Sequence, residues 1–231
     1  MAFEGSSVEE RPRRMATLPF FYTAPLALIL AGALVWRWGG LALSTPWSAY
    51  TLALTHVFTL GFLTMSCVGL VYLMLGWVGS RPAVTPRSTH VVYWLLVTGA
   101  AGLIWGTSRL ASAPVFFAIG AVGLMGVIFL VHAGRALRRA THTGGTRRGL
   151  VLTLWGFAGV AFLGLWLAHG HGGMQFPGPR ALWMQVHGLV GLLAWVGGLL
   201  VTVSSEVWPA LTGGRPLSLR ALRWIIRGVL T

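Results

Sequence analysis

Residues 113–134, APVFFAIGAVGLMGVIFLVHAG, contain one ionisable side chain, His132. A helix of about 20 apolar residues crosses a hydrocarbon core of about 30 Å. Apolar stretches long enough to do the same lie at 19–41, 48–78, 91–108, 149–169 and 181–211. The sequence therefore predicts an all-α fold, a polytopic transmembrane helix bundle with six spans.

The composition excludes an ordinary soluble enzyme. Of the 231 residues, 55% are hydrophobic and 9% are charged, whereas soluble domains carry about 25% charged residues. The 17 basic residues are all Arg, and the net charge of +13 would indicate nucleic acid binding in a soluble chain. Here the Arg residues form short clusters between apolar runs, so the predicted partner is the lipid bilayer and no nucleic acid is expected.

The distribution of Arg predicts the orientation. Fourteen of the 17 Arg fall in the N-terminal segment, the connections after the second and fourth spans, and the C-terminal segment, whereas Arg37, Arg109 and Arg180 fall on the other side. Because cytoplasmic loops carry the excess of Arg and Lys, we expect a multi-pass protein of the plasma (inner) membrane with both ends cytoplasmic. The expected organisation is a polar cytoplasmic tail (1–17), a six-helix domain (18–211) and a basic amphipathic segment (212–231), which is an interfacial helix or a truncated seventh span.

Two histidines are predicted to share a depth in the membrane. His56 falls about eight residues into the second span and His187 about six into the sixth, so both lie on the order of 10 Å below the outer surface at 1.5 Å per residue. His132 falls near the cytoplasmic surface and cannot meet them. Two imidazoles at the same depth in the hydrocarbon core indicate that they are the axial ligands of a haem iron. The alternative is a hydrogen bond from each ring to a neighbouring group.

The outer side carries further candidate ligands. Arg37, Arg109 and Arg180 are suited to anionic haem propionates, or alternatively anchor the helices at the interface. His169, His171 and Met174 could bind copper, because imidazole and thioether suit that metal; a solvated loop is the alternative.

Other polar and small residues have simpler readings. His90 and His142 are expected to be solvated on the cytoplasmic side, and Glu206 to pair with Arg215 or water. Glycines recur in both His-bearing spans, where they permit close packing of a helix or of a flat macrocycle. These glycines are Gly61, Gly69 and Gly76 in the second span, and Gly188, Gly191, Gly197 and Gly198 in the sixth.

The two His-bearing spans share a family resemblance. The second reads HVFTLGFLTMSCVGLVY from His56, and the sixth reads HGLVGLLAWVG from His187 and continues to EVWP at Pro209. Both are similar to helices of proteins akin to haem-copper oxidase subunit I, including the group related to the nitric-oxide-response haem-copper membrane proteins. The matching positions are His56, Phe58, Thr59, Leu60, Gly61, Thr64, Gly69, Tyr72, His187, Trp195, Val196, Gly197, Val207 and Pro209.

The resemblance implies that His56 and His187 bind haem b. The chain lacks the paired His-His and the His-Pro-Glu-Val-Tyr run typical of oxygen-reducing members, so oxygen reduction is not expected. Members are often nearly twice this length, so the chain looks like a minimal or half-length version.

The predicted function is a b-type haem membrane protein. It would transfer electrons, or act as a haem-carrying subunit of a respiratory complex with redox partner subunits. The alternatives are a non-catalytic structural subunit with a vestigial oxidase-like fold, and a copper-handling membrane protein.

Overall fold

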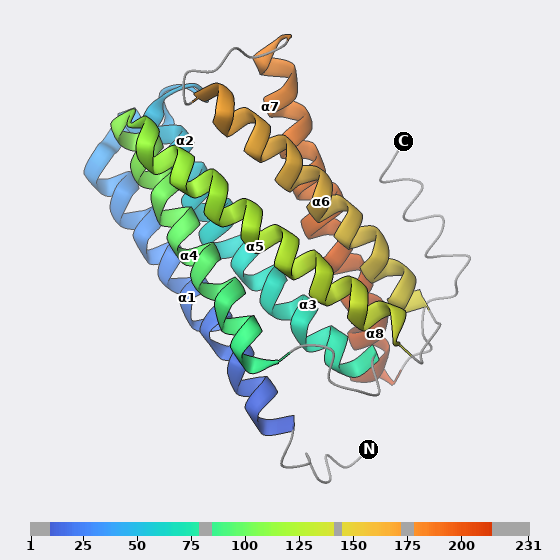
Figure 1. Cartoon of the computed structure of the whole chain (residues 1–231). Coiled ribbons are helices and arrows are strands. Elements are labelled where there is room, and N and C mark those ends of the chain that lie inside the picture. Colours follow the sequence, from blue (N-terminus) through green and yellow to red (C-terminus); the bar gives the residue numbers. More distant parts are fainter. Residues whose placement is uncertain (1–9, 79–84, 141–144, 172–177, 214–231) are drawn as a thin grey trace.

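The computed structural model describes residues 10–78, 85–140, 145–171 and 178–213, and every regular element in these ranges is helical (Figure 1). Within them, 6 helices are long and apolar enough to cross a membrane. The prediction of an all-α bundle with six spans is confirmed. The spans are Met15–Leu43, Ala49–Gly76, Pro86–Arg109, Ser112–Arg138, Gly145–Gly170 and Arg180–Pro209.

Four of the spans are single α-helices. They are α1 (Glu10–Trp38), α4 (Pro86–Arg109), α5 (Ser112–Arg138) and α6 (Gly145–His171), and a 3₁₀ turn, η1 (Gly39–Leu43), follows α1. Helix α1 begins at Glu10, so it extends into the segment expected to be a polar tail. The expected amphipathic segment lies outside the described residues beyond residue 213.

The two His-bearing spans are composite. The second consists of α2 (Ala49–His56), a π-helix η2 (Val57–Thr64) and α3 (Met65–Val78). The sixth consists of α7 (Arg180–Leu189), a π-helix η3 (Val190–Gly197) and α8 (Gly198–Thr212).

Local sequence signals fix several helix ends. Ser48 caps α2, because its side chain accepts a hydrogen bond from the backbone N–H of Thr51 at 3.0 Å. Thr85 caps α4, with Pro86 in the first turn. Leu110 ends α4 in the left-handed conformation, with φ 54°. Since α5 starts two residues later, α4 and α5 form a tight hairpin.

The helices pack as two groups joined by α5. Helix α1 packs on η2, α3 and α4, while α5 packs on α4 and α6, and α6 carries α7, η3 and α8 (Figure 1). We call the end where α1 begins and α8 finishes the terminal end. The opposite end, with η1, the α4–α5 turn and the start of α7, is the far end.

The main apolar core occupies the half of the bundle toward the terminal end. It combines α3, the second half of α5 and the first half of α6 with Trp195 and Leu199. In the far half, α7 has no buried residue, and Ala53 is the buried residue of α2. His56 and His187 therefore belong to the more openly packed half.

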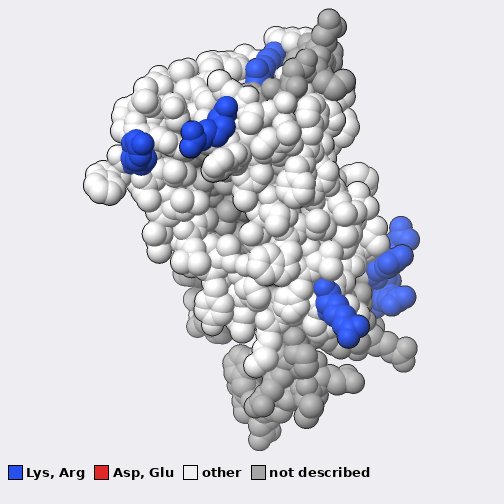
Figure 2. All heavy atoms as spheres, turned by 60° about the vertical axis from the view of Figure 1, so that its left-hand side comes forward, with Lys and Arg blue, Asp and Glu red and all other residues white. Residues whose placement is uncertain are grey.

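The surface has the charge distribution of a membrane protein. Figure 2 shows basic side chains at the two ends and an uncharged band between them. Large apolar side chains such as Ile29, Trp94, Val127 and Trp155 are exposed within the spans. In water this band would be a large exposed apolar surface, so the chain is an integral multi-pass membrane protein.

Candidate functional site

His56 ends α2 with one ring nitrogen fixed. Its Nδ1 lies 2.7 Å from the backbone oxygen of Leu52, one turn earlier. A carbonyl oxygen only accepts hydrogen bonds, so the neutral imidazole carries its proton on Nδ1 and keeps a lone pair on Nε2. Nε2 is therefore the nitrogen that suits a metal.

His187 lies on α7 with its imidazole against α6. A Cβ added to Gly164 of α6 would stand 2.9 Å from Cε1 of this ring. The ring also interacts with the backbone of Val160, and its Nδ1 is buried without a hydrogen-bond partner. An orphaned buried nitrogen is uncommon, and here the ring is held by the notch at Gly164 and by its contact with the Val160 backbone.

His56 and His187 lie close enough for a charge on one imidazole to affect the other. Their spans do not run together, because among the described elements α7, η3 and α8 pack chiefly on α6. The two His-bearing spans therefore do not pack extensively on each other within the described residues.

A π-helix follows each of these histidines. The segment η2 begins directly after His56, and η3 begins three residues after His187. π-Helical turns are rare and are frequent at functional sites. The two π-helices were not predicted, since apolar periodicity does not distinguish a π-turn inside a long span.

Two glycines of the second span serve helix packing. A Cβ at Gly61 would stand 2.8 Å from Cβ of Ala27, and one at Gly69 would stand 2.9 Å from Cβ of Phe20, both on α1. These glycines therefore let α1 approach the second span closely.

Helix α6 also carries a row of glycines, which was not predicted from the sequence. Added Cβ atoms at Gly149, Gly156 and Gly164 would press on Thr202, Ala194 and His187, respectively. The spacing of seven and eight residues, the same as for Gly61, Gly69 and Gly76, was the available signal. These three glycines let the sixth span pack closely on α6 along its length, from Thr202 to the imidazole of His187.

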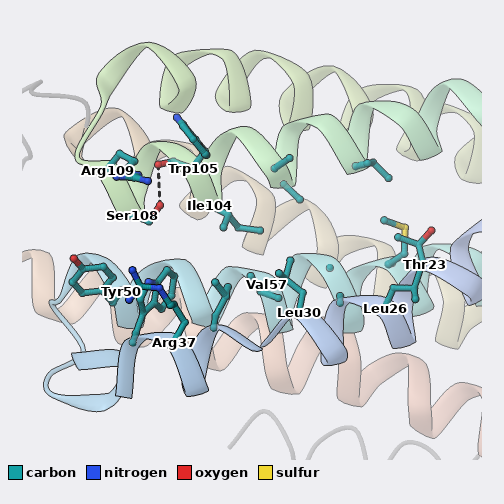
Figure 3. A pocket seen from close by; sticks show the side chains of 18 of the residues that line it. Thr23, Leu26, Leu30, Arg37, Tyr50, Val57, Ile104, Trp105, Ser108 and Arg109 are labelled. Atoms are coloured by element: carbon teal, nitrogen blue, oxygen red, sulfur yellow. Dashed lines mark hydrogen bonds between the residues drawn. The ribbon is translucent and has the colours of Figure 1, made fainter. Parts of the chain in front are cut away.

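The three arginines of the far end lie at two different sites. Arg180 is the first residue of α7, and two helical turns place it about 10 Å from His187 on nearly the same face. Arg37 and Arg109 instead line a groove of about 740 Å³ between α1, α2–η2 and α4 (Figure 3), and the lining includes neither His56 nor His187.

Two other described histidines lie apart from this pair. Nδ1 of His132 is 3.3 Å from the hydroxyl of Tyr72, in the terminal half. His90 is exposed near the start of α4. Neither position brings a further imidazole to His56 and His187, and His142 lies outside the described residues.

The copper candidate stays a prediction. Nδ1 of His169 lies 2.9 Å from the backbone oxygen of Leu165, and His171 is the last residue of α6. The side chain of His171, and Met174 altogether, lie outside the described residues, as do the side chain of Glu206 and Arg215.

The described residues contain no group of three or more His, Cys, Asp or Glu that could hold a metal ion. A metal bound by protein ligands alone commonly needs such a group. A haem iron takes only its axial ligands from the protein, and a pair of histidines suffices for these.

No known protein family, characterised protein or solved structure matches the chain. The relationship to haem-copper oxidase subunit I stays a prediction from the two His-bearing segments.

Proposed function

We propose that the protein is a b-type haem-binding membrane protein, in which His56 and His187 are the axial ligands. The observation that carries the proposal is the proximity of these two imidazoles, from different spans, in the more openly packed half of the bundle. Ionisable groups inside a membrane usually have a functional partner. In this proposal the haem iron would be the shared partner of both histidines.

The surroundings of both rings fit this role. The Leu52 carbonyl fixes the tautomer of His56 and raises the basicity of its Nε2, as outer-shell carbonyls do for ligating histidines. On the other side, the notch at Gly164 orients His187.

The chain's own residues would orient and shield the group. Haem supplies one-electron redox chemistry at its iron when bound. The apolar spans exclude water from the two imidazoles, and Arg180 offers a guanidinium for an anionic propionate on the face of α7 that carries His187. Electron transfer, or haem-carrying service in a respiratory complex, is the function that this set of residues supports.

The proposed orientation follows from the Arg distribution. Both termini would be cytoplasmic in a plasma (inner) membrane, so the far end would face outward. Redox partner subunits would then exchange electrons at the far end, where both histidines lie.

Visible spectroscopy of the purified protein, oxidised against reduced, tests the proposal. After expression with ample haem, the wild type should show a low-spin spectrum, and His56→Ala and His187→Ala should each abolish it. His90→Ala and His132→Ala are matched controls that should keep it. A wild-type protein without a Soret band would contradict haem binding and leave the structural-subunit reading.

A further inference from the structure

The groove between α1, α2–η2 and α4 is long and mainly apolar. Its lining on α1 runs from Thr23 to Trp38, which is about 22 Å along a helix, compared with roughly 15 Å for half of the hydrocarbon core. Its volume of about 740 Å³ is in the range of organic ligand sites. Leu26, Leu30 and Ile104 are among its apolar walls (Figure 3).

The charged groups of the groove gather at the far end. Arg37 of α1 and Arg109 of α4 lie there with Tyr50 and Ser108, while Thr23 and Leu26 lie toward the opposite end (Figure 3). The guanidinium of Arg109 lies over the ring of Trp105, 5.4 Å from its centroid. The groove thus has one cationic end and one uncharged end.

Acidic residues are scarce in the sequence. It contains no Asp, and its four Glu are at positions 4, 9, 10 and 206. The stretch from residue 11 to 205 therefore contains no acidic residue to offset the positive charge of its Arg residues. An anionic ligand would complement Arg37 and Arg109.

We propose that this groove binds an anionic phospholipid of the surrounding bilayer. An acyl chain would lie along the apolar walls, and the phosphate would contact Arg37 and Arg109 through charge-assisted hydrogen bonds. Both the amphiphilic shape of the groove and its net positive charge match this ligand. The site is separate from the haem proposal, because neither histidine of that pair lines the groove.

Two kinds of variant test separately the binding of the phosphate and the binding of the acyl chain. Replacing both Arg37 and Arg109 by Gln removes the charge, and Ala101→Phe fills the groove at an exposed lining residue of α4. The matched controls are Arg138→Gln, at the exposed terminal end, and Ala33→Phe, on α1 outside the groove.

Native mass spectrometry of detergent-purified protein is the test, with added phosphatidylglycerol or phosphatidylcholine of identical acyl chains. We expect the wild type and both controls to bind phosphatidylglycerol about ten-fold more tightly than phosphatidylcholine, which corresponds to a difference in binding free energy of about 1.4 kcal/mol. The double Gln variant should lose the preference, and Ala101→Phe should weaken binding of both lipids.

Several results would overturn the lipid proposal. They are equal binding of the two lipids by the wild type, an effect of Arg138→Gln as large as that of the double Gln variant, or displacement of phosphatidylglycerol by a neutral isoprenoid quinone. The haem spectrum should be the same in all of these variants, so failure of the lipid site and failure of the haem proposal are distinguishable.

Discussion

The imidazole of His187 lies against Gly164 of α6, where an added Cβ would stand 2.9 Å from Cε1 of the ring. A real Cβ does not approach another carbon so closely, so any side chain at residue 164 displaces the imidazole. The orientation of a histidine on the sixth span is thus determined by a glycine on the fifth.

Gly164→Ala should therefore weaken haem binding or convert its spectrum from low spin to high spin. Alanine favours a helix over glycine by about 1 kcal/mol, so a loss of haem would not come from a weaker helix. Gly188→Ala is the control, because a Cβ at that position meets nothing within 4 Å. An unchanged spectrum in Gly164→Ala would show that His187 does not hold the iron.

Hydropathy predicted the six spans because each apolar stretch is bounded by polar or Arg-rich connections. It did not predict where the helices end. Helix α1 starts at Glu10, before the apolar stretch, because Glu and Arg have good helix propensity and nothing requires a helix to end at the membrane surface.

The residue types of the site and their depth in the membrane were predictable, but the helix face on which each residue lies was not. Depth follows from counting residues along a span, which places His56 and His187 in the same half. The face on which a residue lies depends on the helix geometry, and the π-helices change the number of residues per turn within both spans. The arginines were also not separated by sequence. Arg180 shares a side of the membrane with Arg37 and Arg109, but its place around the bundle depends on which helices pack together.

Trp195 should be the most sensitive aromatic residue of the core. It is 2% exposed, and its ring centroid lies 4.9 Å from that of Phe157 and 6.2 Å from that of Phe129. Trp195→Ala should lower the free energy of unfolding by about 3 kcal/mol through the cavity it leaves. Trp195→Phe should cost less, since it also removes a buried indole N–H that has no partner.

Trp155→Ala provides the comparison for Trp195, because Trp155 is 73% exposed and its removal leaves no cavity. Unfolding of detergent-solubilised protein in increasing denaturant measures all three variants. Equal destabilisation by Trp155→Ala and Trp195→Ala would contradict the placement of the core.

The proposed orientation predicts the accessibility of single cysteines in intact cells. Thr45→Cys, exposed at the far end, should react with a membrane-impermeant thiol reagent, and Thr212→Cys, exposed at the terminal end, should react only after permeabilisation. Both are made in a Cys67→Ser background, although the native thiol is buried. The reverse labelling pattern would place both termini outside.

Arg180→Gln should loosen haem more than any other change of a far-end arginine. Arg180 precedes His187 by seven residues in the same helix, so the two lie on nearly the same face of α7, about 10 Å apart. A charge-assisted hydrogen bond to a propionate contributes roughly 1.5–3 kcal/mol, and its loss should accelerate transfer of haem to apomyoglobin about ten-fold or more. Arg37→Gln is the matched control at the same end of the bundle, since Arg37 lines the groove on α1, and it should leave the transfer rate unchanged. A larger effect of Arg37→Gln would place the propionates in that groove, and the assignment of its cationic end to a phospholipid would then be wrong.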